Sequence, residues 1–300
     1  MKKLFFLLFI SVLYSCQPKA TDEVSQWEAQ AENVTIIRDD FGVPHIYGKT
    51  DADAVFGLLY AQCEDDFARV ERNYVWATGR LAEMEGEDAL YSDLRARLYM
   101  TVEEAKAAYD ASPKWLQELC DAYADGINYY LHTHPEVQPK VLTRFEPWFP
   151  MFFSEGSIGG DIESISTRRV KSFYENDQSL ALTEFGDGLT HPDPYEEPKG
   201  SNGFAIAGEH TASGDAMLLI NPHTSFYFRP EVHVVSEEGL NAYGAVTWGQ
   251  FFVYQGFNDR MGWMHTSTAV DFIDEFVEEV SEVDGKLKYK YGGFGSYLEI

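Results

Sequence analysis

The residues best placed to do chemistry are Gly200 and Ser201, which stand among other small residues. Alternating apolar positions follow at once over residues 204–208, so the stretch predicts a turn that runs into a buried strand. The segment before it, residues 193–199, is rich in proline and charge. A cut after Gly200 would leave Ser201 with a free α-amine, which is a base on the nucleophile's own residue. The alternative is an ordinary loop-to-strand junction in which serine and glycine are turn residues.

A serine that attacks an amide carbonyl needs a base and hydrogen-bond donors for the oxyanion. A free α-amine on Ser201 would titrate near pH ~8 and could take the hydroxyl proton directly or through water. His223 comes directly after the next apolar strand, in an Asn-Pro-His sequence, where it could reach the start of a neighbouring strand. A surface or capping histidine is the other interpretation. Residues 263–267 end a further strand and offer backbone N–H groups for an oxyanion.

Hard oxygen ligands gather a few residues further on. Residues 271–275 place carboxylates and a backbone carbonyl close together, which is chemistry suited to Ca²⁺, and Glu163 is the candidate partner from an earlier segment. The alternative is a solvated acidic turn.

Composition limits the classes of function. The chain has 300 residues, of which 45% are apolar and 15% aromatic, enough for the core of one large domain or two small ones. Its net charge of −26 argues against nucleic acid and against a polyanionic substrate.

The first sixteen residues predict a targeting segment. Lys2 and Lys3 precede an apolar run over residues 4–13, which is too short to span a bilayer as a stable helix. The sequence that ends at Cys16 resembles the lipobox of bacterial lipoproteins, in which the cysteine becomes the lipidated N-terminus; a plain secretory signal is the alternative. With residues 17–32 as a polar tether, we expect an exported lipoprotein of the bacterial cell envelope, periplasmic or associated with the outer membrane. Its contact with the membrane would be the lipid anchor alone.

The elements that must position these residues fall into two groups. Residues 33–185 carry a hairpin and then helices, residues 186–200 read as a linker, and short strands follow. Helices followed by an antiparallel sheet predict an α+β fold. The expected helices lie at 50–74, 90–100, 101–109, 112–131 and 162–174. The expected strands lie at 34–38, 45–48, 204–207, 216–221, 226–236, 240–247, 251–258, 261–268 and 275–281.

Two further expectations follow from this layout. Cys63 and Cys120 lie in helix-like segments, and either one disulfide or two buried free thiols would suit them. The sheet lacks a cover on one face, so residues 201–300 are expected to be the start of a longer unit that is truncated here.

Several ordered motifs resemble the penicillin acylases and acyl-homoserine-lactone acylases. The N-terminal ones are VTIIRDDFGVPHI at 34–46, FGLLYAQCED at 56–65 and GRLAE at 79–83. The junction at residues 200–202 looks like the autoproteolytic site of these N-terminal nucleophile hydrolases, and residues 262–266 resemble another of their signatures. The resemblance covers most of residues 33–280.

The resemblance implies an αββα sandwich made from a precursor, or zymogen, that cuts itself into α and β chains. Residues 33–185 would be the α-chain region, and residues 201–300 the start of the β chain. Ser201 would be the nucleophile, and its amine the base. His223 matches an amine-supporting histidine of the acyl-homoserine-lactone and cephalosporin acylases, and Ser267 matches the residue whose backbone N–H serves the oxyanion hole.

The resemblance also implies a structural Ca²⁺, held by Asp271, Ile273 and Asp274 with Glu163 as the helix-side ligand, and no organic cofactor. The substrate would be a small N-acyl amide of the penicillin, cephalosporin or N-acyl-homoserine-lactone type, so the role would be antibiotic metabolism or quorum quenching. The aromatic residues 148–153 would border an apolar acyl pocket. The alternative function is a truncated, inactive, lipid-anchored binding protein that retains part of the fold.

Overall fold

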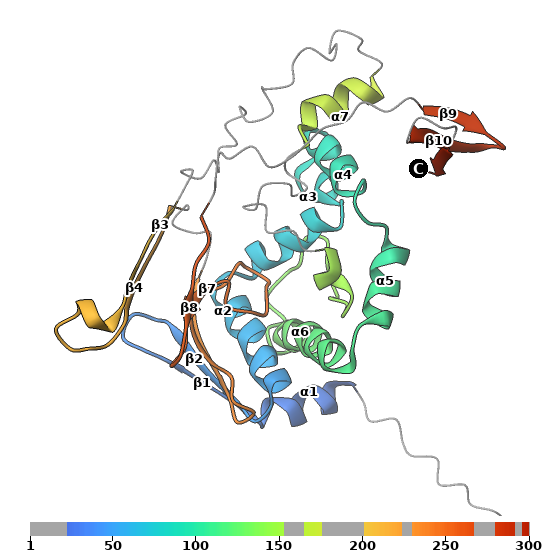
Figure 1. Ribbon diagram of the computed structural model, residues 1–300. Coiled ribbons are helices and arrows are strands. Elements are labelled where there is room, and N and C mark those ends of the chain that lie inside the picture. The colour runs from blue at the N-terminus through green and yellow to red at the C-terminus, as the bar shows by residue number, and fades with distance from the viewer. Residues whose placement is uncertain are drawn as a thin grey trace, which may run out of the picture.

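The computed structural model describes residues 23–152, 165–175, 201–223, 230–266, 280–291 and 296–299 (Figure 1). The helices are α1 (Glu23–Ala31), α2 (Asp51–Ala77), α3 (Leu81–Glu85), α4 (Leu90–Ala96), α5 (Val102–Ala111), α6 (Lys114–Thr133) and α7 (Thr167–Tyr174), with short 3₁₀ turns η1 (Glu87–Ala89), η2 (Phe149–Phe152) and η4 (Gly208–His210). The strands are β1 (Val34–Arg38), β2 (Pro44–Gly48), β3 (Ser201–Ile206), β4 (Met217–Pro222), β5 (Glu231–Ser236), β6 (Asn241–Ala245), β7 (Gln255–Phe257), β8 (Gly262–Trp263), β9 (Val280–Val283), β10 (Lys286–Tyr291) and β11 (Ser296–Glu299). This order of helices and strands confirms the α+β class.

Helix α2 is the centre of the core. It begins with a capping box in which the Thr50 side chain accepts from the Asp53 N–H, and the Asp53 carboxylate accepts from the Thr50 N–H. Helix α6 crosses it at very short range, since a Cβ on Gly126 would lie 2.4 Å from the carbonyl oxygen of Phe56. Glycine is therefore required at this crossing, as a larger residue would push the two helices apart.

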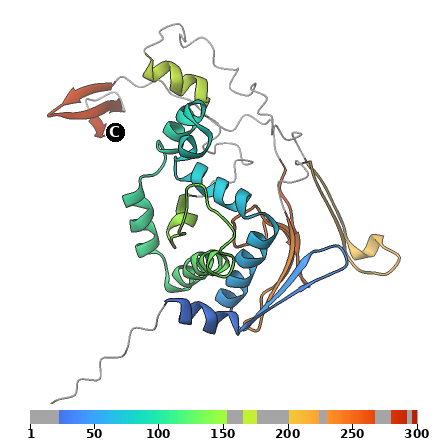
Figure 2. The ribbon, with the colours of Figure 1, turned by 180° about the vertical axis from the view of Figure 1, so that it is seen from behind.

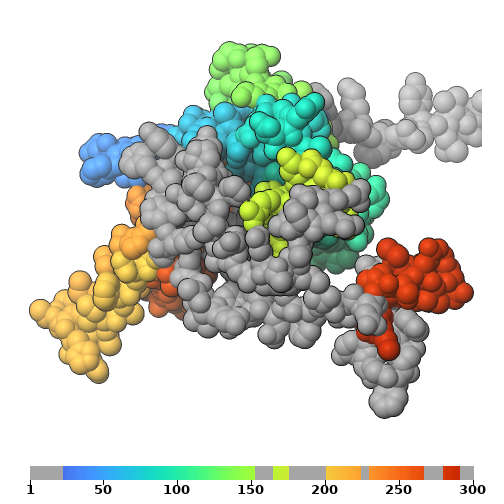
Figure 3. Space-filling model, turned by 90° about the horizontal axis from the view of Figure 1, so that it is seen from above, coloured from blue at the N-terminus to red at the C-terminus, as the bar shows by residue number. Residues whose placement is uncertain are grey.

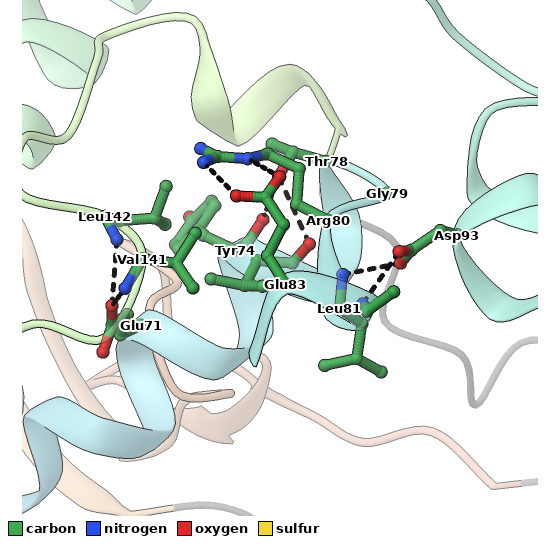
Figure 4. Close-up of polar contacts among 12 residues, drawn as sticks. Glu71, Tyr74, Thr78, Gly79, Arg80, Leu81, Glu83, Asp93, Val141 and Leu142 are labelled. Atoms are coloured by element: carbon green, nitrogen blue, oxygen red, sulfur yellow. Dashed lines mark hydrogen bonds and ion pairs between the residues drawn. The ribbon is translucent and has the colours of Figure 1, made fainter. Parts of the chain in front are cut away.

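Two buried carboxylates fix the surroundings of α2 (Figure 4). Glu71 accepts from the N–H groups of Val141 (2.7 Å) and Leu142 (2.9 Å), so it ties the segment after α6 to α2. Asp93 on α4 accepts from the N–H of Leu81 at 2.6 Å and so supplies a partner to the open N-terminus of α3. These bonds satisfy backbone donors that would otherwise be buried without a partner.

The main sheet has six strands in the order β1-β2-β5-β6-β7-β8, and the helices cover one of its faces (Figure 2). The β1–β2 hairpin is antiparallel, as expected, but β2 pairs with β5 in parallel, with Ile46 opposite Val234. The strands after Ser201 in this sheet, β5 to β8, pair antiparallel as expected, whereas the parallel pairing of β2 with β5 was not predicted. Ile46, Val232 and Val234 all turn inward to the α2 core, and this burial pattern is the same whichever way the neighbouring strand runs.

The described residues also contain two small antiparallel sheets, β3–β4 and β9–β10–β11. Of the expected αββα sandwich, the described residues form one helical layer and one β layer, which is the six-stranded sheet.

Cys63 and Cys120 are buried free thiols, so of the two alternatives that the sequence left open, a disulfide or two free thiols, the structure shows the second. Among the helices given above, none combines the length and the apolar character needed to cross a membrane.

Candidate active site

Ser201 is the first residue of the β3–β4 hairpin, and the pairing of the two strands determines what lies beside it. The register places Ser201 opposite Pro222, so the residue after β4, His223, returns to the start of β3. The backbone N–H of His223 donates to Oγ of Ser201 at 3.4 Å. The sequence predicted that these two residues would be neighbours, and the structure places them so.

The imidazole of His223 lies beside two asparagines. Its Nε2 is 3.0 Å from Nδ2 of Asn202 and 3.2 Å from Oδ1 of Asn221, so the tautomer of the ring decides which asparagine makes the hydrogen bond. Sequence reasoning missed both asparagines, although one follows Ser201 directly and the other belongs to the Asn-Pro-His sequence. The ring is thus fixed on the hairpin, and it is the backbone N–H of His223 that contacts the serine hydroxyl.

The segment after β8 holds the other side of Ser201. Oγ1 of Thr266 donates to the carbonyl oxygen of Ser201 at 3.0 Å. The two segments run very close together, because a Cβ on Gly203 would lie 1.9 Å from Sδ of Met264. Glycine at position 203 therefore lets the segment approach β3 and lets Thr266 reach the serine.

This segment is itself fixed to the main sheet. Nε1 of Trp263 donates to the carbonyl oxygen of Val253 at 3.0 Å, and Nε2 of Gln255 donates to that of His265 at 3.2 Å. The ring centroids of Tyr254 and His265 are 4.6 Å apart. Contacts between side chains and backbone thus link the surroundings of Ser201 to β7 and the core.

Ser201 stands where a small molecule could reach it. It is half-buried, whereas the rest of β3 is exposed, and the hairpin projects at the edge of the molecule (Figure 3). The expectation of a buried strand here was therefore wrong, because among the described residues β3 pairs only with β4, in a two-stranded sheet. A hydroxyl with an N–H directed at its oxygen and with its main chain held on both sides is suited to nucleophilic attack.

The other predicted site residues lie outside the described residues, so their roles stay predictions. They are Cys16, Glu163, Gly200, Ser267, Asp271, Ile273 and Asp274. Within the ranges that the structure describes, no three histidine, cysteine, aspartate or glutamate side chains form a group that could hold a metal ion.

The aromatic residues expected at an acyl pocket do line a cavity, but not next to the serine. Trp148, Phe149 and Phe152 border a cavity of about 690 Å³ between residues 141–152 and the start of α5; Phe153 lies outside the described residues. These walls lie on the side of α2 away from β3–β4 (Figures 1 and 2). Two arginines in the wall are each paired with a glutamate, Arg80 with Glu83 at 2.7 Å and Arg144 with Glu23 at 2.5 Å.

Comparison with known proteins places the chain in a family. A family model described as penicillin amidase matches residues 33–298. The chain belongs to this family.

Its relatives are similar at low identity. The chain is 26% identical over 314 residues to the acyl-homoserine lactone acylase QuiP of Pseudomonas fluorescens. The aligned region covers 91% of this chain and 38% of the relative. It is 25% identical over 282 residues to the acyl-homoserine lactone acylase PvdQ of P. fluorescens, covering 85% of this chain and 35% of the relative. A solved structure, the thermostable penicillin G acylase from Alcaligenes faecalis, has 23% identity and a TM-score of 0.36, covering 40% of this chain and 68% of that one. The chain thus spans less than two fifths of the length of these two curated relatives.

Proposed function

We propose that the chain carries the nucleophile of a self-processing amidohydrolase that cleaves the amide bond of N-acyl compounds. The observation that carries the proposal is the arrangement at Ser201. Its Oγ accepts from the N–H of His223 at 3.4 Å, and its carbonyl accepts from Thr266 at 3.0 Å, at the first residue of a strand. Membership of the penicillin amidase family supports it.

The proposed reaction uses groups of Ser201 itself. Cleavage of the bond between Gly200 and Ser201 frees the α-amine, which takes the proton of the serine hydroxyl as Oγ attacks the substrate carbonyl. The N–H of His223 lies against Oγ and stabilises negative charge that develops there. The leaving amine takes the proton, and an acyl-enzyme remains on Oγ. Water then attacks the ester, releases the carboxylic acid and restores the hydroxyl.

N-acyl-homoserine lactones are the proposed substrates, and penicillins or cephalosporins are the alternative. The preference rests on the names of two relatives, which are acyl-homoserine lactone acylases. The histidine at position 223 weighs only against penicillins, because it matches a histidine of both the acyl-homoserine-lactone and the cephalosporin acylases. An assay of the freed amine separates these classes, since the lactone substrates release homoserine lactone and the penicillins release the β-lactam nucleus.

Two accessory features belong to the same proposal. Glu163, Asp271, Ile273 and Asp274 would bind a structural Ca²⁺, so a chelator would lower the melting temperature. Cys16 would carry a lipid that holds the protein in the cell envelope, which mass spectrometry of the membrane fraction would detect as an acylated N-terminus.

The deciding experiment is mass spectrometry of the purified chain and of two variants. The wild-type chain should yield a fragment that begins at Ser201, and Ser201→Ala should abolish that fragment. Ser213→Ala, in the β3–β4 connection, is the matched control and should be cut like the wild type. An intact wild-type chain would refute self-processing and favour the inactive binding protein.

A further inference from the structure

The carbonyl of Ser201 is held from outside its own hairpin. Pro222, the residue opposite Ser201 on β4, has no N–H and so cannot donate to this carbonyl. The oxygen accepts from Oγ1 of Thr266 at 3.0 Å, a residue that lies 65 positions further along the chain. Because Oγ of the same serine accepts from the N–H of His223, two atoms on different branches of Ser201 are held at once. The Cα of Ser201, and the nitrogen attached to it, therefore have little freedom to turn.

The hydroxyl of Thr266 is presented from a backbone that is fixed on the main sheet. Nε2 of Gln255 donates at 3.2 Å to the carbonyl oxygen of His265, the residue just before Thr266. Gln255 is only 4% exposed, and its Oε1 has no hydrogen-bond partner among the described residues. A buried amide with one unbonded end costs stability, so an apolar side chain would suit this place better as packing. What glutamine adds here is the bond to His265, which keeps Thr266 directed at the serine.

We propose that Thr266 is a positioning residue for Ser201, with Gln255 supporting it from β7; the inference rests on the function proposed above. In the self-cleavage, Oγ of Ser201 attacks the carbonyl carbon of Gly200, its proton passes to the nitrogen of Ser201 as the C–N bond breaks, and water hydrolyses the resulting ester. The bond from Thr266 holds the main chain of Ser201 while Oγ makes this attack. After the cut, Ser201 is a chain end, which frays unless other contacts tie it down, and the same bond supplies such a contact.

Loss of the Thr266 hydroxyl should affect the rate of cleavage and not the stability of the fold. Thr266 is exposed, so in Thr266→Val water can bond the serine carbonyl in its place. Water does not fix the direction of that carbonyl, and a misplacement of about 1 Å in a reacting group can cost on the order of a hundredfold in rate. A merely structural role would give another pattern, in which the rate falls only as far as the stability does.

The test measures how fast the fragment that begins at Ser201 appears, by mass spectrometry, with urea midpoints measured alongside. Thr266→Val keeps the shape of the side chain without the hydroxyl and should slow the cut by about tenfold, since the N–H of His223 still holds Oγ. Thr266→Ser keeps the hydroxyl and should restore most of the rate. Gln255→Met should also slow the cut. None of these three variants should lower the urea midpoint.

Thr211→Val is the matched control. Oγ1 of Thr211 donates to the carbonyl oxygens of Gly208 (3.0 Å) and Asp215 (2.8 Å) in the connection between β3 and β4, so the variant removes the same group from the same hairpin. It should be cut at the rate of the wild type. A second readout is the carbonyl ¹³C resonance of Ser201, which is unique when serine carbonyls carry ¹³C and asparagine amides ¹⁵N, because residues 201–202 are the one Ser-Asn step in the sequence. It should move in Thr266→Val and stay in Thr266→Ser and in the control.

The outcomes separate this inference from the function on which it rests. If the wild type is cut and Thr266→Val is cut equally fast, the positioning role is overturned and self-processing stands. Equal slowing in Thr266→Val and Thr266→Ser, slowing matched by a loss of stability, or an unchanged carbonyl resonance in Thr266→Val would also overturn it. A wild-type chain that stays intact would refute the proposed function itself and, with it, the role of Thr266.

Discussion

Replacing Gln62 with leucine should show how strongly α2 holds the segment that follows β6. Gln62 is 1% exposed. Its Nε2 donates to the carbonyl oxygen of Gln250 and its Oε1 accepts from the N–H of Gly249, each at 2.8 Å. Leucine has a similar volume, so the packing survives, but the two buried backbone groups lose their partners. Each orphaned group costs about 1–3 kcal/mol, so we expect a loss of about 3 kcal/mol in the free energy of unfolding.

Urea denaturation followed by circular dichroism measures this loss. Gln117→Leu is the matched control, because its Nε2 donates to the carbonyls of Tyr109 (3.0 Å) and Asp110 (3.1 Å) where water can replace it. The control should lose less than about 1 kcal/mol. Equal losses in the two variants, or a loss below about 1 kcal/mol for Gln62→Leu, would refute the reasoning that burial of the backbone partners decides the cost.

Two further predictions concern the serine hairpin and the buried thiols. Gly203→Ala should cost about 1 kcal/mol and slow the appearance of the fragment that begins at Ser201, because the new methyl group would lie 1.9 Å from Sδ of Met264. Desolvation raises the pKa of Cys120 to about 12 and that of Cys63 well above its ordinary value, so at pH ~8 both should react with a disulfide reagent far more slowly than free cysteine.

Each of these predictions has its own control. Adding Met264→Ala to Gly203→Ala should restore stability and processing; no restoration would mean that the contact with Met264 is not the cause. In urea, both thiols should react at the rate of free cysteine. Rapid labelling of the native chain at Cys63 or Cys120 would show that the helices around them open readily.

Much of the local structure could be predicted from the sequence, because its signals act over a few residues. The first long helix was expected to start at residue 50, and α2 does begin there, with Thr50 as the N-cap of a capping box. The two short strands expected at 34–38 and 45–48 indicated the first hairpin, and they pair antiparallel as β1 and β2. The helix expected over 90–100 instead ends at Ala96, and the strand expected over 251–258 shortens to Gln255–Phe257. Element ends depend on which groups find tertiary partners, which local patterns do not contain.

At the candidate site, too, the sequence predicts part of the arrangement and the tertiary structure decides the rest. The sequence by itself indicated a strand just after Ser201, expected at 204–207 and observed at Ser201–Ile206, and a second strand that His223 follows; hairpin pairing then brings Ser201 and His223 together. Only the tertiary structure decided that Thr266 holds the serine carbonyl, since that contact depends on the close approach at Gly203.

The parallel pairing of β2 with β5 was likewise decided only by the tertiary structure. It brings His45 against His233, two residues that are 188 positions apart in the chain. Hydrophobic alternation shows which face of a strand is buried but not which strand lies beside it or in which direction. Both strands pack on α2, whose apolar surface Ile46 and Val234 cover together, so they become neighbours only once the tertiary structure has formed.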